Sequence, residues 1–166
     1  MRLQNSRILH SVIRATMVSQ GLQNAVEACV SQHRAQVIEL TVRGEHGSRV
    51  IEVFIDAEQS VTSELCTQLA REISDLLNDR RLVDGPYRLT VSSPGLDRPL
   101  TFEWQYQKHI GRVMQLRTRS STEEQLITGT LVGVENGGIL LRVADESQPL
   151  RISFDTILEA KIKTPW

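Results

Sequence analysis

The sequence predicts a mixed α+β protein in which an α-β-β-α-β domain of two layers precedes a small β-barrel. Three observations support this class. Apolar residues recur at both helical and strand spacings in the first half of the chain, and at strand spacing alone in the second half. A proline-containing run at 92–100 separates the two halves. We therefore expect a basic extension at 1–17, a domain at 18–91, a rigid interdomain loop at 92–100 and a second domain at 101–166.

Two helices are expected in the first domain. The first spans about 18–33 and has an apolar stripe at helical spacing, namely Leu22, Val26, Cys29 and Val30. The second begins after Thr62, whose hydroxyl is suited to capping a helix N-terminus. Its apolar stripe consists of Leu65, Leu69, Ile73, Leu76 and Leu77.

Three strands are expected beside these helices. In each of them apolar and polar residues alternate, as in a strand with one buried face, and the apolar positions are Ile38, Leu40 and Val42, then Ile51, Val53 and Ile55, then Tyr87, Leu89 and Val91. A polar, glycine-containing hairpin connection at 45–48 joins the first two, and a break at 84–86 precedes the third. Two helices covering one face of a three-stranded sheet is the economical arrangement of these elements.

The second domain is expected to contain a short helical turn at 101–108 and then five short strands within about 55 residues. Asn136-Gly137 predicts a two-residue type I′ hairpin turn, in which both residues have φ > 0. Short strands without a long helix are typical of a small closed barrel, and the SH3-like or Sm-like barrel matches the size. The apolar positions of the strands are Met114 and Leu116; Ile127 and Leu131; Ile139, Leu141 and Val143; Leu150, Ile152 and Phe154; and Leu158, Ala160 and Ile162.

The run at 92–100 is expected to be stiff. Pro94 and Pro99 fix their own φ and push the preceding residue toward extended geometry. Pro94-Gly95 fits the centre of a type II turn, which requires φ > 0 at the glycine. Leu96 and Leu100 are apolar anchors that such a loop could dock onto a neighbouring surface. We therefore interpret the run as a rigid elbow between two domains.

The overall charge does not indicate a protein that binds naked RNA tightly. The net charge of the 166 residues is −1, and residues 92–166 carry nine basic and nine acidic side chains. A strongly basic composition is the usual signature of sequence-independent RNA binding. Of the 19 basic residues 16 are arginine, which leaves room for local contacts with carboxylate or phosphate.

Neither a metal nor a cofactor is expected. Cys29 and Cys66 lie on the apolar faces of the two predicted helices and are interpreted as buried, reduced thiols. The four histidines lack the spacing of a metal site, and the chain has neither a phosphate-binding loop nor a dinucleotide fingerprint. No apolar stretch is long enough to cross a membrane, so we expect a cytoplasmic protein. We also expect a monomer.

The first 17 residues contain three arginines and no acidic residue. This composition fits an organelle transit peptide. The interpretation we favour is an upstream start codon or a frayed extension ahead of Met17, without a targeting role. The sequence leaves both interpretations open.

The run VSSPGLDRPL resembles the signature of the ribosome maturation factor RimP family. RVIEVFIDAEQSVTSELCTQLAREISDLL is similar to the second strand and second helix of that family, and HIGRVMQLRT and ITGTLVGVENGGILLRV to the opening of its second domain. The resemblance covers about residues 20–163. The signature positions are Ser93, Pro94, Gly95, Leu96, Asp97, Arg98, Pro99 and Leu100.

An enzyme is not expected. Ser92, Ser93, Asp97 and His109 include the residue types of a hydrolytic triad, but no nucleophile elbow is present. Asp97 is expected to accept backbone hydrogen bonds in the elbow, with Arg98 forming an ion pair across the domain junction. Alternatively, Arg98 contacts ribosomal RNA phosphate or an acidic patch.

The barrel surface is the candidate partner-binding surface. Its charged residues form either a solvated mixed-charge face or a contact surface. The resemblance implies that the second domain contacts the ribosomal protein of the decoding region, which is strongly basic, and acidic residues such as Glu123, Glu124, Asp145 and Glu146 would suit it. The candidate residues are Arg112, Arg117, Arg119, Glu123, Glu124, Asp145 and Glu146, with Arg142 and Arg151 on later strands.

The resemblance implies a non-catalytic assembly factor for maturation of the small (30S) ribosomal subunit. Its partner would be the immature small subunit, including the rRNA and the decoding-region protein. The alternative is a free-standing Sm-like RNA-binding regulator. The neutral second half and the scarcity of aromatic residues for base stacking count against that alternative.

Overall fold

The computed structural model describes residues 18–165 and contains helices and two separate β-sheets, which confirms the mixed α+β class. The predicted basic extension at 1–17 lies outside the described residues. The described chain divides between Pro94 and Gly95 into two compact units, and each is described by itself. In residues 18–165, no helix combines the length and apolar character that a membrane crossing needs.

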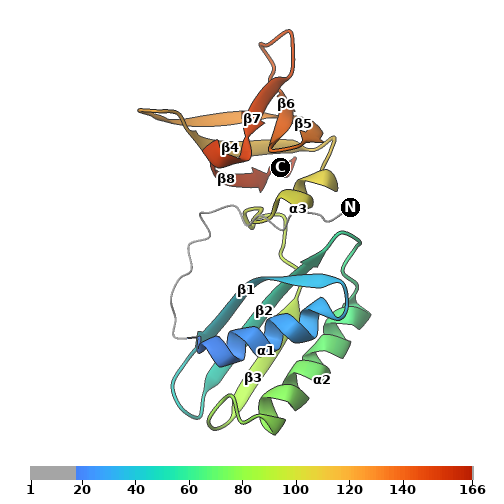
Figure 1. Cartoon of the computed structure of the whole chain (residues 1–166), viewed down its shortest axis with the longest axis vertical. Helices are drawn as coiled ribbons and strands as arrows, with labels where there is room; N and C mark the ends of the chain where they lie inside the picture. Colours follow the sequence, from blue (N-terminus) through green and yellow to red (C-terminus); the bar gives the residue numbers. More distant parts are fainter. Residues whose placement is uncertain (1–17, 166) are drawn as a thin grey trace. The chain divides into compact units, whose positions relative to one another are not determined.

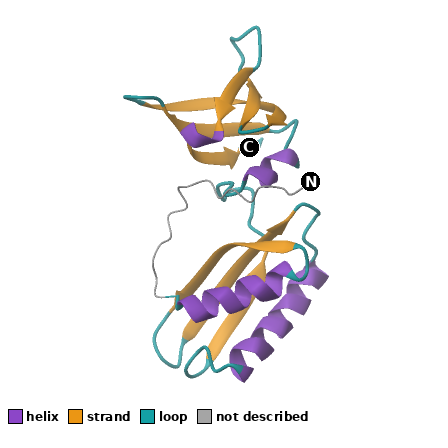
Figure 2. Ribbon diagram, in the orientation of Figure 1, coloured by secondary structure: helices purple, strands orange, loops and turns teal. Residues whose placement is uncertain are grey.

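The first unit is an α-β-β-α-β arrangement in which two helices lie on one face of a three-stranded sheet (Figures 1 and 2). The strand order is β1-β2-β3, with an antiparallel β1–β2 pair and a parallel β2–β3 pair. The parallel pair requires a crossover connection, which α2 provides. Its elements are α1 (Gln20–Ser31), β1 (Ala35–Arg43), β2 (Arg49–Ala57), α2 (Ser63–Asp79) and β3 (Tyr87–Ser92).

Both helices begin at hydroxyl side chains. Ser19 Oγ accepts a hydrogen bond from the Leu22 amide, and the predicted cap Thr62 accepts one from the Leu65 amide. Each bond satisfies a backbone donor that a helix N-terminus leaves without a partner. The helices then bury their apolar stripes against the sheet, in a core that contains Leu22, Val26, Val30, Ile51, Val53, Ile55, Leu69, Ile73 and Leu77.

The second unit contains a short helix and a five-stranded antiparallel sheet (Figure 2). The Gln105 side chain accepts hydrogen bonds from the Thr101 and Phe102 amides and so fixes the start of the helix. The elements are α3 (Glu103–Gln107), β4 (Val113–Arg119), β5 (Glu124–Glu135), β6 (Gly138–Arg142), β7 (Leu150–Ser153) and β8 (Ile157–Ile162), with a 3-10 turn at Phe154–Thr156.

The expected closed barrel is not found. In the described chain the strand order is β7-β6-β5-β4-β8, so β7 and β8 form the two ends of an open sheet. The 3-10 turn separates them and no strand pairing joins them among residues 18–165. The sheet nevertheless surrounds a single apolar cluster that includes Tyr106, Met114, Leu116, Leu131 and Ile139.

Two turn types differ from the sequence prediction. At the β5–β6 hairpin only Gly137 has positive φ (80°), so the turn is not type I′, although Glu135 and Gly138 do pair on either side of it. Gly95 does not have positive φ either, so Pro94-Gly95 is not the centre of a type II turn. Glycine permits positive φ but does not require it, and therefore its presence alone does not determine a turn type.

Candidate functional site

The signature segment forms a turn two residues later than predicted. The Arg98 amide donates to the Gly95 carbonyl over 3.1 Å, which places Leu96 and Asp97 at the centre of the turn. The Leu96 side chain is 39% exposed, so it does not act as a buried anchor. Leu100 does: its amide donates to the Ala160 carbonyl over 2.8 Å, and its side chain packs against the core of the second unit.

The charged centre of this segment also differs from the prediction. The exposed Asp97 carboxylate accepts no hydrogen bond within residues 18–165, so it does not hold the turn as expected. The turn is closed by backbone atoms instead. Arg98 is half-buried. Its expected ion pair across the domain junction and its alternative contact with RNA both stay predictions.

The candidate arginines Arg117 and Arg119 lie on β4 and share one carboxylate. Arg117 Nη1 lies 3.3 Å and Arg119 Nη2 lies 3.1 Å from the two oxygens of Glu124 on β5. These two guanidinium groups, Arg119 first, hold the pKa of Glu124 below its usual range. The pairs are exposed, so each contributes little to stability. Their main effect is to orient charge on the sheet surface.

The network continues onto β8, which sequence reasoning did not select. Arg117 Nη2 also lies 3.4 Å from Glu159, whose other oxygen lies 2.6 Å from Lys161 Nζ. The hydrogen bond from Lys161 contributes most to the lowered pKa of Glu159. A signal for these two residues was present, because they alternate with the apolar Ala160 and Ile162.

The four candidate acidic residues lie in two places. Glu123 and Glu124 stand at the β4–β5 connection, whereas Asp145 and Glu146 lie between β6 and β7 (Figure 1). Arg142, the last residue of β6, pairs with Thr130, six residues along β5 from Glu124. At about 3.3 Å per residue, the two connections lie about 20 Å apart. One compact partner group therefore cannot contact all four carboxylates.

The candidate Arg112 lies on the other side of β4 from Arg117. Its carbonyl accepts a hydrogen bond from the amide of Leu131, which lies in the core, so Arg112 extends the β4–β5 pairing by one residue. Successive residues of a strand point to opposite faces. Arg112 is exposed at the end of the sheet and does not join the charged network on the outer face.

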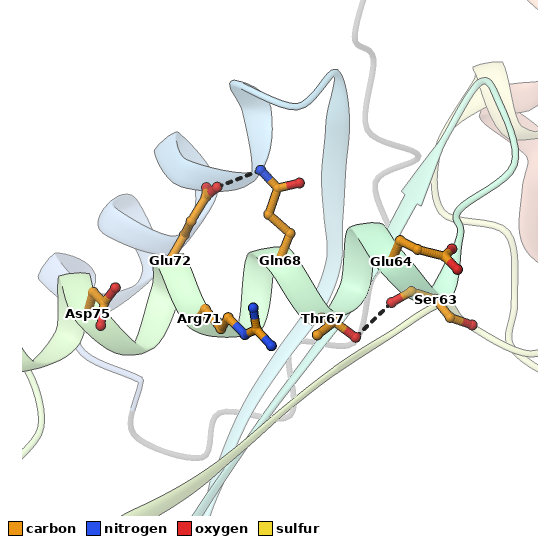
Figure 3. Close-up of a pocket in the computed structure, with 7 residues that line it drawn as sticks. All are labelled: Ser63, Glu64, Thr67, Gln68, Arg71, Glu72 and Asp75. Atoms are coloured by element: carbon orange, nitrogen blue, oxygen red, sulfur yellow. Dashed lines mark hydrogen bonds between the residues drawn. The ribbon is translucent and has the colours of Figure 1, made fainter.

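The helical layer of the first unit carries a second polar cluster, centred on Glu72 of α2. His33 Nε2 lies 2.7 Å from Glu72 Oε2, and Gln68 Nε2 donates to Glu72 Oε1 over 2.9 Å. The hydrogen bond from Gln68, followed by that from His33, lowers the pKa of Glu72. Figure 3 shows a hollow beside it whose side chains all come from α2. The cluster ties α1 to α2 and offers no enclosed binding site.

Both cysteines are free thiols, and both are half-buried rather than fully buried as expected. They pack against the core of the first unit. Burial is the largest cause of the raised pKa of each thiol, and Glu72 adds to it for Cys29. A raised thiol pKa lowers nucleophilic reactivity. Within residues 18–165, no three His, Cys, Asp or Glu side chains are grouped as metal ligands.

Residues 25–97 match the model of one protein family, the RimP N-terminal domain. The matched range begins within α1, includes all three strands of the first sheet and ends inside the turn closed by Gly95 and Arg98. It therefore covers the first unit from the middle of α1 onward and the first part of the signature segment.

Proposed function

Because the chain carries an N-terminal domain of the RimP family, a family of ribosome maturation factors, we propose that it assists maturation of the small (30S) ribosomal subunit in the cytoplasm. The family match at 25–97 is the observation that carries this proposal. The family is one of non-enzymatic assembly factors, so the protein acts by binding and not by catalysis. We propose that the second unit is a divergent SH3-like or Sm-like module.

The proposed mechanism uses two binding surfaces, one on each unit. An assembly factor of this kind stabilises an arrangement of rRNA and ribosomal protein before the mature contacts exist, and then leaves. The acidic residues at the β4–β5 and β6–β7 connections of the second unit are suited to binding a strongly basic ribosomal protein such as that of the decoding region, because opposite charges steer and orient association.

The separation of the acidic residues allows the protein contact to be mapped. Asp145→Lys with Glu146→Lys alters the β6–β7 connection alone, and Glu123→Lys alters the β4–β5 connection without breaking the bonds of Glu124 to Arg117 and Arg119. Weaker capture of the decoding-region protein by one of these variants identifies the connection that it contacts. Unchanged capture by both variants overturns the acidic-contact proposal.

A reconstitution experiment tests the function itself. Small subunits are assembled from purified rRNA and ribosomal proteins with and without the protein, and the rate and yield of mature particles are measured. The proposal predicts faster or more complete assembly, with the protein absent from the finished particles. An unchanged rate and yield, with folded protein present throughout, contradict it.

A further inference from the structure

The outer face of the second sheet has a net charge that the neutral composition of the unit does not reveal. On β4 the residues Met114, Leu116 and Thr118 are buried, so Val113, Gln115, Arg117 and Arg119 lie on the opposite, outer side of the strand. Paired residues of neighbouring strands share a face. The register therefore identifies the outer side of every strand in the sheet.

This outer face is cationic. Unit 95–165 has nine basic and nine acidic residues, yet six of the basic residues and only three of the acidic ones lie on the outer face. The face therefore has a charge of +3, and the rest of the unit has −3. The charged residues of the face are Arg117, Arg119, Arg142, Arg151, Lys161 and Lys163, and Glu124, Glu135 and Glu159.

The three carboxylates are all occupied by cations of the same face. Glu124 binds Arg117 and Arg119, Glu159 binds Arg117 and Lys161, and Glu135 binds Arg151 over 3.2 Å. Two exposed cations remain, Arg142 and Lys163, for which residues 18–165 supply no ion-pair partner. These two cations are therefore available for an external anion.

Arg142 and Lys163 lie in one row across the sheet. The Lys163 amide donates to the Val113 carbonyl, Val113 pairs with Thr130, and Thr130 pairs with Arg142. Three inter-strand spacings of about 4.8 Å put the two cations about 14 Å apart. Val113, which is 41% exposed, and Thr130 lie between them. The β6–β7 connection carries Asp145 and Glu146 close to Arg142 in sequence, but neither forms an ion pair with it in the described chain.

The chemistry of this row fits a chain of phosphates. Among the described residues of the unit, 95–165, no aromatic side chain lies on the outer face, so these residues offer no platform for stacking bases. Its spaced cations suit the regularly repeated charges of a nucleic acid backbone, which fix position without reading sequence.

We propose that the outer face of β8-β4-β5-β6 binds the phosphodiester backbone of small-subunit rRNA, with Arg142 and Lys163 as the principal contacts. The identity of the RNA rests on the proposed function. Together with the acidic residues at the β4–β5 and β6–β7 connections, this face lets one neutral unit bind two oppositely charged components of an assembling subunit. The rRNA binds the cationic face, and a basic ribosomal protein binds the acidic residues outside it.

The salt dependence of binding measures these contacts. Each neutralised phosphate contributes about 0.7 to 0.9 to the slope of log K against log salt concentration, so two contacts contribute about 1.4 to 1.8. The test compares wild type with the double variant Arg142→Gln and Lys163→Gln. Arg112→Gln is the matched control, because it removes an exposed arginine of the same unit that lies off the outer face. Exposed substitutions of this kind leave the fold intact, so a change of slope reports binding.

Binding is measured to protein-free small-subunit rRNA and to immature small subunits. The inference predicts that the double variant binds the rRNA and the immature subunits more weakly than wild type does. For each ligand, its slope of log K against log salt concentration is smaller in magnitude by about 1.4 to 1.8. Arg112→Gln is predicted to leave both slopes unchanged. Unchanged slopes in the double variant, or an equal effect of Arg112→Gln, overturn the inference. Continued binding of wild type to immature subunits in that case leaves the proposed function standing.

Two further outcomes separate the partners. If the double variant loses affinity for the immature subunit but not for protein-free rRNA, the face contacts an acidic protein and the RNA assignment is overturned. If the double variant lowers the slope for protein-free rRNA as predicted but wild type does not bind the immature subunit, the phosphate-binding face is supported and the proposed function fails.

Discussion

Replacing tyrosine by phenylalanine is expected to change the free energy of unfolding in opposite directions at two positions, Tyr106 and Tyr87. The Tyr106 hydroxyl lies in the core of the second unit, is fully buried and has no hydrogen-bond partner in the described chain. Burial raises the pKa of Tyr106 well above its usual range. The Tyr87 hydroxyl instead donates to Asn78 Oδ1 over 3.0 Å and contacts Ser74 Oγ at 3.3 Å.

The expected magnitudes follow from these surroundings. A buried polar group without a partner costs about 1 to 3 kcal/mol, so Tyr106→Phe should raise the free energy of unfolding by up to that amount. The Phe side chain retains the edge-on contact with Phe154, whose ring centroid lies 5.2 Å away. Tyr87→Phe removes a hydrogen bond and should lower the free energy of unfolding by about 0.5 to 1.5 kcal/mol.

Chemical denaturation measures both values. Trp104 lies on α3 of the second unit, so its fluorescence reports unfolding of that unit, and far-UV circular dichroism follows both units. A loss of more than about 1 kcal/mol in Tyr106→Phe would show that its hydroxyl is hydrogen-bonded in solution, and would refute the reasoning. Equal effects of the two substitutions would refute it as well.

Three other predictions concern the helices and the interdomain run. Thr62→Ala removes the hydrogen bond to the Leu65 amide and should lower the free energy of unfolding by about 0.5 to 2 kcal/mol, as measured by denaturation. Because the folded pKa of Glu72 lies below its ordinary 4.5, its bonds stabilise the fold above that pH and are lost as the pH falls through the folded pKa. Glu72→Gln should therefore flatten the decline of thermal stability below about pH 4.5, whereas Glu64→Gln on the same helix serves as the control; equal profiles for both would contradict this. Pro94→Gly with Pro99→Gly should leave the circular dichroism unchanged and weaken binding to the small subunit, and full binding by that variant would show that the stiffness of the run is irrelevant.

The sequence predicted those features of the fold that depend on local pattern. The stripe from Leu65 to Leu77 and the cap at Thr62 placed α2, and the alternation at Ile51, Val53 and Ile55 placed β2. The turn at Asn136-Gly137 was located but given the wrong type, and the turn expected at Pro94-Gly95 is centred on Leu96 and Asp97 instead, because residue type limits φ without determining it.

Long-range pairing accounts for what the sequence could not predict. The ion network on the outer face depends on β8 lying beside β4, which places Glu159 within reach of Arg117, 42 positions earlier in the chain. The +3 charge of that face was likewise hidden, because strand alternation sends neighbouring residues to opposite sides while composition averages over them. The 20 Å separation of the acidic residues follows from the β5–β6 register and from no local signal.

Co-sedimentation tests the central claim most directly. The full chain is centrifuged with immature small subunits, with mature small subunits and with complete ribosomes, at low salt and with its folding verified by circular dichroism. The account predicts that the protein sediments with immature small subunits and stays unbound in the presence of complete ribosomes. Absence of the protein from every particle, or equal binding to all three, would contradict a role in small-subunit maturation.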